Sequence, residues 1–115
     1  MVDLSAFLGL ADMPLGELVA KPTSLTGDQF EASVALAQHD KVEIGVWECT
    51  AGRFTADRST SSEFCHFISG VIEMTHQDGT KQRLGAGDAI FLPLGWRGEW
   101  HVIEHVRKLY VITQA

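Results

Sequence analysis

The chain has 115 residues, of which 45% are hydrophobic and 21% are charged, and its formal net charge is −6. This length fits one domain, which is expected to bury roughly 65% of the surface that its unfolded form exposes. The acidic balance argues against nucleic acid as a partner, because that interaction needs clustered basic residues and the nine Lys and Arg are scattered.

Hydropathy and cysteine usage indicate a cytoplasmic protein. No apolar run approaches the length of about 20 residues that a membrane helix needs, so no membrane partner is expected. Asp3 stands where a secretory signal carries positive charge, which favours a cytoplasmic location. Cys49 and Cys65 lie in strand-like segments without CxxC spacing, so we expect reduced, buried thiols.

The N-terminal third is expected to differ from the rest of the chain. Residues Asp3 to Ala11 could form one or two helical turns, but this segment is short, contains Gly9 and ends before Pro14. We therefore divide the chain into an N-terminal arm, residues 1–30, and a main domain, residues 31–115. The arm is expected to pack onto the main domain or onto a partner.

After residue 30, short runs rich in Val, Ile, Phe and Trp alternate with Gly, Pro and Asp, which is an all-β pattern. The predicted strands are Glu31 to Ala37, Val42 to Thr50, Glu63 to Ser69, Val71 to Gln77, Thr80 to Leu84, Ala89 to Leu92, Gly98 to Ile103 and Arg107 to Thr113. Asp78 and Gly79 predict a two-residue hairpin turn with positive φ at both positions. Eight short strands suit a sandwich or a barrel.

Two separated blocks resemble the paired motifs of the cupin superfamily. In the first block Gly52 precedes Glu63, which is followed by six residues and Gly70; in the second, five residues separate Gly87 from Pro93-Leu-Gly95. Gly and Pro supply the sharp turns that strands need where they cross between sheets. The resemblance implies a cupin-type double-stranded β-helix, an RmlC-like jelly-roll barrel.

A narrower resemblance covers roughly residues 40 to 113. The segments Gly45-Val-Trp-Glu-Cys, Glu63-Phe-Cys-His, Phe91-Leu-Pro-Leu-Gly-Trp and Glu104-His-Val-Arg-Lys-Leu-Tyr110 are similar to short members of the cupin family grouped with (S)-ureidoglycine aminohydrolase. That resemblance implies a homodimer.

The histidines of a cupin metal site are missing from the motif positions. Such a site takes two or three histidines and one glutamate. The first histidine pair falls within Asp57-Arg-Ser-Thr60, the second motif's histidine position is Gly98, and its asparagine position is Val102. A one-residue shift leaves two oxygen donors, Asp57 and Glu63, for a hard divalent cation. We therefore expect no complete metal site and no cofactor, with these two carboxylates as the candidate ligands.

Strand alternation predicts which side chains face the barrel interior. Glu63 and Cys65 face inward from one strand, whereas His66 faces outward; Gly98 and Trp100 face inward from a later strand. Gly98 would leave space where a histidine usually stands, and Trp100 would offer a flat wall with an N–H donor. The predicted pocket residues are Asp57, Arg58, Glu63, Cys65, Gly98 and Trp100.

A carboxylate inside a barrel needs compensation. Arg58 and Arg107 are the available partners. If an arginine pairs with Glu63, that carboxylate is structural; if it stays unpaired, it could be a general acid or base.

Two functions remain open from the sequence. The first is a metal-independent cupin that binds a small molecule of unknown identity. The alternative is a metal-dependent or acid/base enzyme on a ureido, amide or sugar-like substrate, resembling ureidoglycine aminohydrolase, with Glu63 transferring the proton and Asp57 or Cys65 assisting. An interface role is also possible for Trp96, which is expected to face outward, and for the arm.

Overall fold

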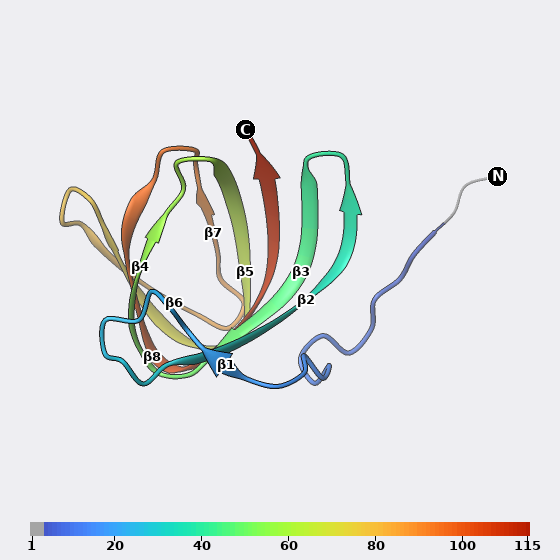
Figure 1. Ribbon diagram of the computed structural model, residues 1–115, viewed down its shortest axis with the longest axis horizontal. Helices are drawn as coiled ribbons and strands as arrows, with labels where there is room; N and C mark the ends of the chain where they lie inside the picture. Colours follow the sequence, from blue (N-terminus) through green and yellow to red (C-terminus); the bar gives the residue numbers. More distant parts are fainter. Residues whose placement is uncertain (1–3) are drawn as a thin grey trace.

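The computed structural model describes residues 4–115, and in this range it consists of antiparallel strands and connecting segments without a helix. The strands are β1 (Val19–Ala20), β2 (Phe30–His39), β3 (Val42–Cys49), β4 (Gly52–Asp57), β5 (Ser61–His76), β6 (Lys81–Gly85), β7 (Ala89–Leu92) and β8 (Arg97–Gln114). They curve into a jelly-roll barrel (Figure 1), so the all-β barrel prediction is confirmed. Within the described range there is no helix long and apolar enough to cross a membrane.

Two long strands, β5 and β8, connect the two halves of the barrel. They pair with each other from Ser61↔Gln114 to His76↔Gly98. The first half of β8 also pairs with β4 and its second half with β3, while β5 pairs with β7 and then with β6. Each long strand therefore belongs to both halves of the barrel (Figure 1). Side chains from distant parts of the sequence meet in its interior cluster.

A bend in β5 changes which residues face inward. Cys65 and Phe67 are buried before the bend, whereas Ile72 and Met74 are buried after it, so the inward parity switches from odd to even numbers. The register against β8 shifts three times between Phe67 and Ile72, as expected for β-bulges. Gly70, in the middle of this stretch, has a φ of 95°.

The predicted strand boundaries were wrong in three respects. β4 was missed, because its six residues follow β3 closely and contain no apolar run. The two halves of β5, and likewise of β8, were predicted as separate strands, since the sequence signals at the bends resemble turns. The short β1, paired with β2, was also not predicted.

The hairpin between β5 and β6 exists, but its turn is longer than predicted. The Gly79 N–H donates to the His76 carbonyl at 2.9 Å, and the His76 N–H donates to the Thr80 carbonyl at 2.8 Å. Gly79 has a φ of 89°, but Asp78 does not have a positive φ; among the described non-glycine residues only Asp40 does. The loop is therefore a three-residue turn that needs one glycine, and the Asp78 carboxylate accepts the Thr80 N–H at 2.9 Å.

Two apolar clusters lie on opposite faces of the sheet. The larger one fills the barrel and includes Phe67, Met74 and Trp100. The smaller one lies outside the barrel, where Leu15 packs with Ala32 and Val46. The N-terminal segment is thus attached at its later residues, whereas Leu4 and Leu8 are largely exposed. The beginning of the described chain extends away from the barrel (Figure 1).

The possible N-terminal helix is absent from the described part, residues 4–11, and Asp3 lies outside the described residues. Arg107 holds this segment in place. Its Nη1 donates to the carbonyl oxygens of Leu10 and Met13 at 2.8 and 2.7 Å, and its Nη2 lies 2.6 Å from Glu48 Oε2.

The bend in β5 gives a testable difference between two glycines with similar φ. A Cβ on Gly70 would collide with the His105 carbonyl oxygen and lie 2.6 Å from Val106 Cα, whereas a Cβ on Gly79 would meet open space. We predict that Gly79→Ala lowers the free energy of unfolding by about 1 kcal/mol, from the positive φ alone, and that Gly70→Ala lowers it by several kcal/mol more. Urea unfolding measures both, and equal losses would contradict the close approach at the bend.

Candidate functional site

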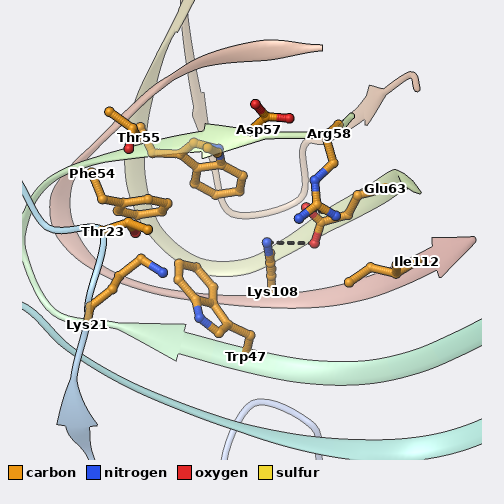
Figure 2. Close-up of a pocket in the computed structure, with 12 residues that line it drawn as sticks. Lys21, Thr23, Trp47, Phe54, Thr55, Asp57, Arg58, Glu63, Lys108 and Ile112 are labelled. Atoms are coloured by element: carbon orange, nitrogen blue, oxygen red, sulfur yellow. Dashed lines mark ion pairs between the residues drawn. The ribbon is translucent and has the colours of Figure 1, made fainter. Parts of the chain in front are cut away.

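A cavity of about 390 Å³ lies inside the barrel. Its lining comes from the segment after β1, with Lys21 and Thr23, from β3, β4, β5 and β8, and from the β4–β5 connection, with Arg58. In Figure 2, Lys21, Arg58, Glu63 and Lys108 point into the cavity, whereas the Asp57 carboxylate points away from them. The lining combines three aromatic rings, Trp47, Phe54 and Trp100, with five charged side chains, Lys21, Asp57, Arg58, Glu63 and Lys108.

The centre of the site is a buried ion pair between β5 and β8. Lys108 Nζ lies 2.8 Å from Glu63 Oε2, and the two side chains are 8% and 6% exposed. Arg58 Nη1 approaches the other carboxylate oxygen, Oε1, at 3.9 Å. Figure 2 shows the two cations approaching the same carboxylate from different elements.

This arrangement keeps both partners of the central pair charged. Burial opposes ionisation of Glu63, but the charge and hydrogen bond of Lys108, together with the charge of Arg58, hold the pKa of that carboxyl below its usual value. Burial also opposes the charge on Lys108, yet the charge and hydrogen bond of the Glu63 carboxylate keep the lysine pKa above its usual value. Charge-assisted contacts of this kind compensate the cost of desolvation when the two charged groups lie within hydrogen-bond distance.

Two indole rings flank the Lys108 ammonium. Nζ lies 4.4 Å from the ring centroid of Trp47 and 4.3 Å from that of Trp100, which is within range for cation–π attraction. The two indoles meet edge to face at 5.7 Å, and Phe54 stacks on Trp100 at 5.4 Å with 23° between the planes. The aromatic wall therefore holds the lysine in place while it also lines the cavity.

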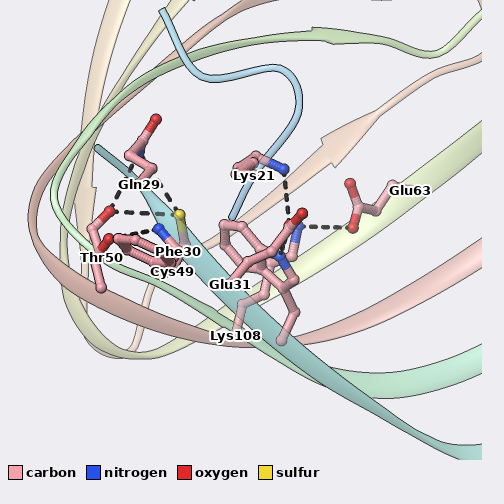
Figure 3. A network of polar contacts seen from close by, with 9 residues as sticks. Lys21, Gln29, Phe30, Glu31, Cys49, Thr50, Glu63 and Lys108 are labelled. Atoms are coloured by element: carbon pink, nitrogen blue, oxygen red, sulfur yellow. Dashed lines mark hydrogen bonds and ion pairs between the residues drawn. The ribbon is translucent and has the colours of Figure 1, made fainter. Parts of the chain in front are cut away.

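A second ion pair, between Lys21 and Glu31, lies close to the first one (Figure 3). Lys21 Nζ lies 2.9 Å from Glu31 Oε1, and the same oxygen accepts the Trp47 Nε1–H at 2.9 Å. Lys21 Nζ also lies 4.3 Å from the Phe54 ring centroid. Burial opposes ionisation of Glu31, but the hydrogen bonds from Trp47 and Lys21 hold its pKa below the usual value.

The structure places four of the six predicted pocket residues in this cavity: Asp57, Arg58, Glu63 and Trp100. Cys65 is fully buried in the core, and Gly98 lines a neighbouring hollow of about 370 Å³ together with Asp57 and Arg97. Both cysteines are free and buried, as predicted. Burial raises the pKa of the Cys65 thiol to about 12, which makes it a poor nucleophile at neutral pH.

Sequence reasoning missed Lys108, Lys21, Trp47 and Phe54. Arg107 was considered as the partner of Glu63, but its guanidinium pairs with Glu48 on the outer side of the sheet. The alternation Val106, Lys108, Tyr110, all buried, was the signal that could have identified the lysine.

Gly98 does not leave open space, contrary to the prediction. A Cβ at this position would collide with the Thr75 carbonyl oxygen and lie 2.5 Å from Trp96 Cζ2. Trp96 is accordingly not an outward side chain: it packs against the core, and its Nε1–H donates to His76 Nδ1 at 2.8 Å. The Trp96 ring fills the space beside Gly98 and prevents any larger residue there.

The donors in the cavity do not fit a cupin transition-metal centre. No imidazole lines the cavity, and residues 4–115 contain no group of three or more His, Cys, Asp and Glu side chains arranged to hold a metal ion. Glu63 is engaged by Lys108, while Asp57 accepts the Ser59 N–H at 2.7 Å and lies 3.2 Å from Arg97. In this chain the cation bound by Glu63 is a lysine ammonium.

The central pair can be tested by a double-mutant cycle. Removing one partner leaves a buried charge, so we predict that Glu63→Gln and Lys108→Met each lower the free energy of unfolding by about 3–5 kcal/mol, and that the double variant loses much less than their sum. The exposed pair of Lys81 and Glu73 is the control, because Lys81→Met should cost at most about 1 kcal/mol. Additive losses at Glu63 and Lys108 would contradict the pairing.

The sign of the pH dependence follows from the lowered pKa of Glu63. Its contribution to stability is present above its usual pKa of 4.5 and is lost as the pH falls through the lower folded-state value. The stability difference between the wild type and Glu63→Gln should therefore shrink on acidification below 4.5.

Comparisons with known proteins agree with this fold. A family model described as the EutQ-like cupin domain matches residues 36–110. The solved structure of the Clostridium difficile EutQ protein is 22% identical, with 77% of this chain and 71% of that chain covered and a TM-score of 0.68. A protein from Salmonella typhimurium described as an ethanolamine utilization protein Q is 20% identical, with 85% and 79% covered and a TM-score of 0.69.

A DUF861-family protein from Thermotoga maritima is 37% identical, with 56% of this chain and 73% of that chain covered and a TM-score of 0.54. No curated protein matches this sequence. Because the family model covers more than half of the chain, the chain belongs to the EutQ-like cupin domain family.

Proposed function

We propose that this EutQ-like cupin domain binds a small molecule in its barrel cavity without a histidine metal centre. The observation that carries the proposal is the cavity itself, whose volume of about 390 Å³ lies in the usual range for ligand pockets. Apolar ring faces with a few converging polar groups are the usual lining of such pockets, and the rings of Trp47 and Phe54 with the Arg58 guanidinium have this character.

The contacts of Glu63 favour binding over acid/base catalysis. A general acid or base works best with a pKa near the working pH, whereas the pKa of Glu63 is lowered and its carboxylate is paired with Lys108. A reaction resembling that of ureidoglycine aminohydrolase is the alternative proposal, and it would require a metal for which the cavity lacks imidazole ligands.

A thermal-shift screen with a matched pair of variants tests the binding proposal. Thr23 is exposed and lines the cavity, so Thr23→Trp should obstruct it; Gln77→Trp adds the same ring at an exposed position of the β5–β6 turn that does not line the cavity. The library should contain neutral, anionic and cationic compounds of drug-fragment size. A ligand at 100 times its dissociation constant stabilises the native state by about 2.7 kcal/mol.

We expect that at least one compound raises the melting temperature of the wild type and of Gln77→Trp by roughly 5 °C or more, and raises that of Thr23→Trp much less. Both variants should match the wild type without a ligand. A flat response across the library, or equal shifts in all three proteins, would reject a ligand site in this cavity.

A further inference from the structure

We infer that the ligand of this cavity is a small monoanion, a carboxylate attached to a flat or apolar body. This inference rests on the proposed binding function and specifies its ligand class. Three features carry it: the charge balance around the cavity, the unused hydrogen-bond donors of Arg58, and the aromatic wall of the cavity.

The charged groups around the cavity leave one positive charge without a partner. Three cations, Lys21, Arg58 and Lys108, face two carboxylates, Glu31 and Glu63. The remaining acidic group, Asp57, is half exposed and is paired with Arg97. The chain as a whole carries a net charge of −6, so this cavity has the opposite sign to the molecule. A single negative charge on the ligand would balance it.

Arg58 has the donors to bind that negative charge. Its contacts to other side chains are a hydrogen bond to Ser61 Oγ at 3.3 Å and the approach to Glu63 at 3.9 Å, which is too long for a hydrogen bond. A guanidinium carries five N–H donors in a planar fork that matches the two oxygens of a carboxylate. The closer cation, Lys108, already donates to Glu63, which leaves the Arg58 fork available to the ligand.

The aromatic lining indicates what kind of body the carboxylate is attached to. Trp47, Phe54 and Trp100 form a continuous wall of ring contacts, which favours a flat or apolar body that buries carbon surface. A dianion would leave the cavity with an excess of negative charge, and a cation would add to the positive charge already present.

Isothermal titration with three phenyl compounds of similar size tests the inference: benzoate, the neutral benzamide and the cationic benzylamine. We expect benzoate to bind about tenfold or more tightly than benzamide, because a charge-assisted contact is worth more than a neutral one. Benzylamine should bind most weakly of the three. The preference for benzoate should decrease with added salt, although less than it would for an exposed site.

Four variants assign the effect to the cavity. Arg58→Gln should weaken the binding of benzoate by about tenfold and leave the binding of benzamide unchanged. The benzoate affinity of Arg58→Lys should lie between those of the wild type and Arg58→Gln, because lysine keeps the charge but lacks the planar fork of donors. Glu31→Gln keeps an acceptor for Lys21 and Trp47 but removes a negative charge, so it should tighten benzoate binding. Arg53→Gln is the matched control: Arg53 pairs with Glu99 at the surface, and benzoate binding should not change.

Equal affinities for benzoate and benzamide, or a higher affinity for benzylamine, would overturn the inference of an anionic ligand. The proposal that the cavity binds a small molecule would still stand. No binding of any of the three would also overturn the inference; a separate hit in the thermal-shift screen then shows whether the proposed function survives. Melting temperatures of all variants without ligand establish that each is folded.

Discussion

The buried ion pair between Glu63 and Lys108 determines what the interior of this barrel can do. Its two residues come from β5 and β8, the long strands that span both halves of the fold, so the pair joins them directly at the cavity. Charges in such a place persist only when they compensate each other closely. The indoles of Trp47 and Trp100 on either side of the ammonium add to that compensation, and the same rings form the cavity wall.

A lysine in this role changes the chemistry expected of a cupin barrel. Glu63 occupies the glutamate position of the motif, yet its cation is supplied by the chain itself and cannot exchange substrate ligands as a metal ion does. The site therefore favours recognition through hydrogen bonds, charge and ring faces. The surplus positive charge near Arg58 favours the anionic ligand that we infer for this cavity.

The sequence predicted the barrel and the inward direction of Glu63, because turn glycines and strand alternation are local signals. It did not predict Lys108, since a lysine is taken to be solvated by default. In the structure Val106, Lys108 and Tyr110 share the inner face of β8, which buries the lysine. The prediction of open space at Gly98 was wrong for a different reason. The Trp96 ring, from the preceding turn, fills this space, and the Thr75 carbonyl oxygen of another strand also lies close to it. Contacts of this kind have no local pattern.

The most direct test of this account is a nuclear magnetic resonance titration that follows the side-chain carboxyl carbon of Glu63 and the Nζ nitrogen of Lys108. The account predicts that Glu63 titrates below its usual pKa of 4.5 and that Lys108 stays charged to a pH above its usual pKa of 10.5. A Glu63 pKa raised above 4.5, or a neutral Lys108 at neutral pH, would contradict the central pair and with it the charge balance of the cavity.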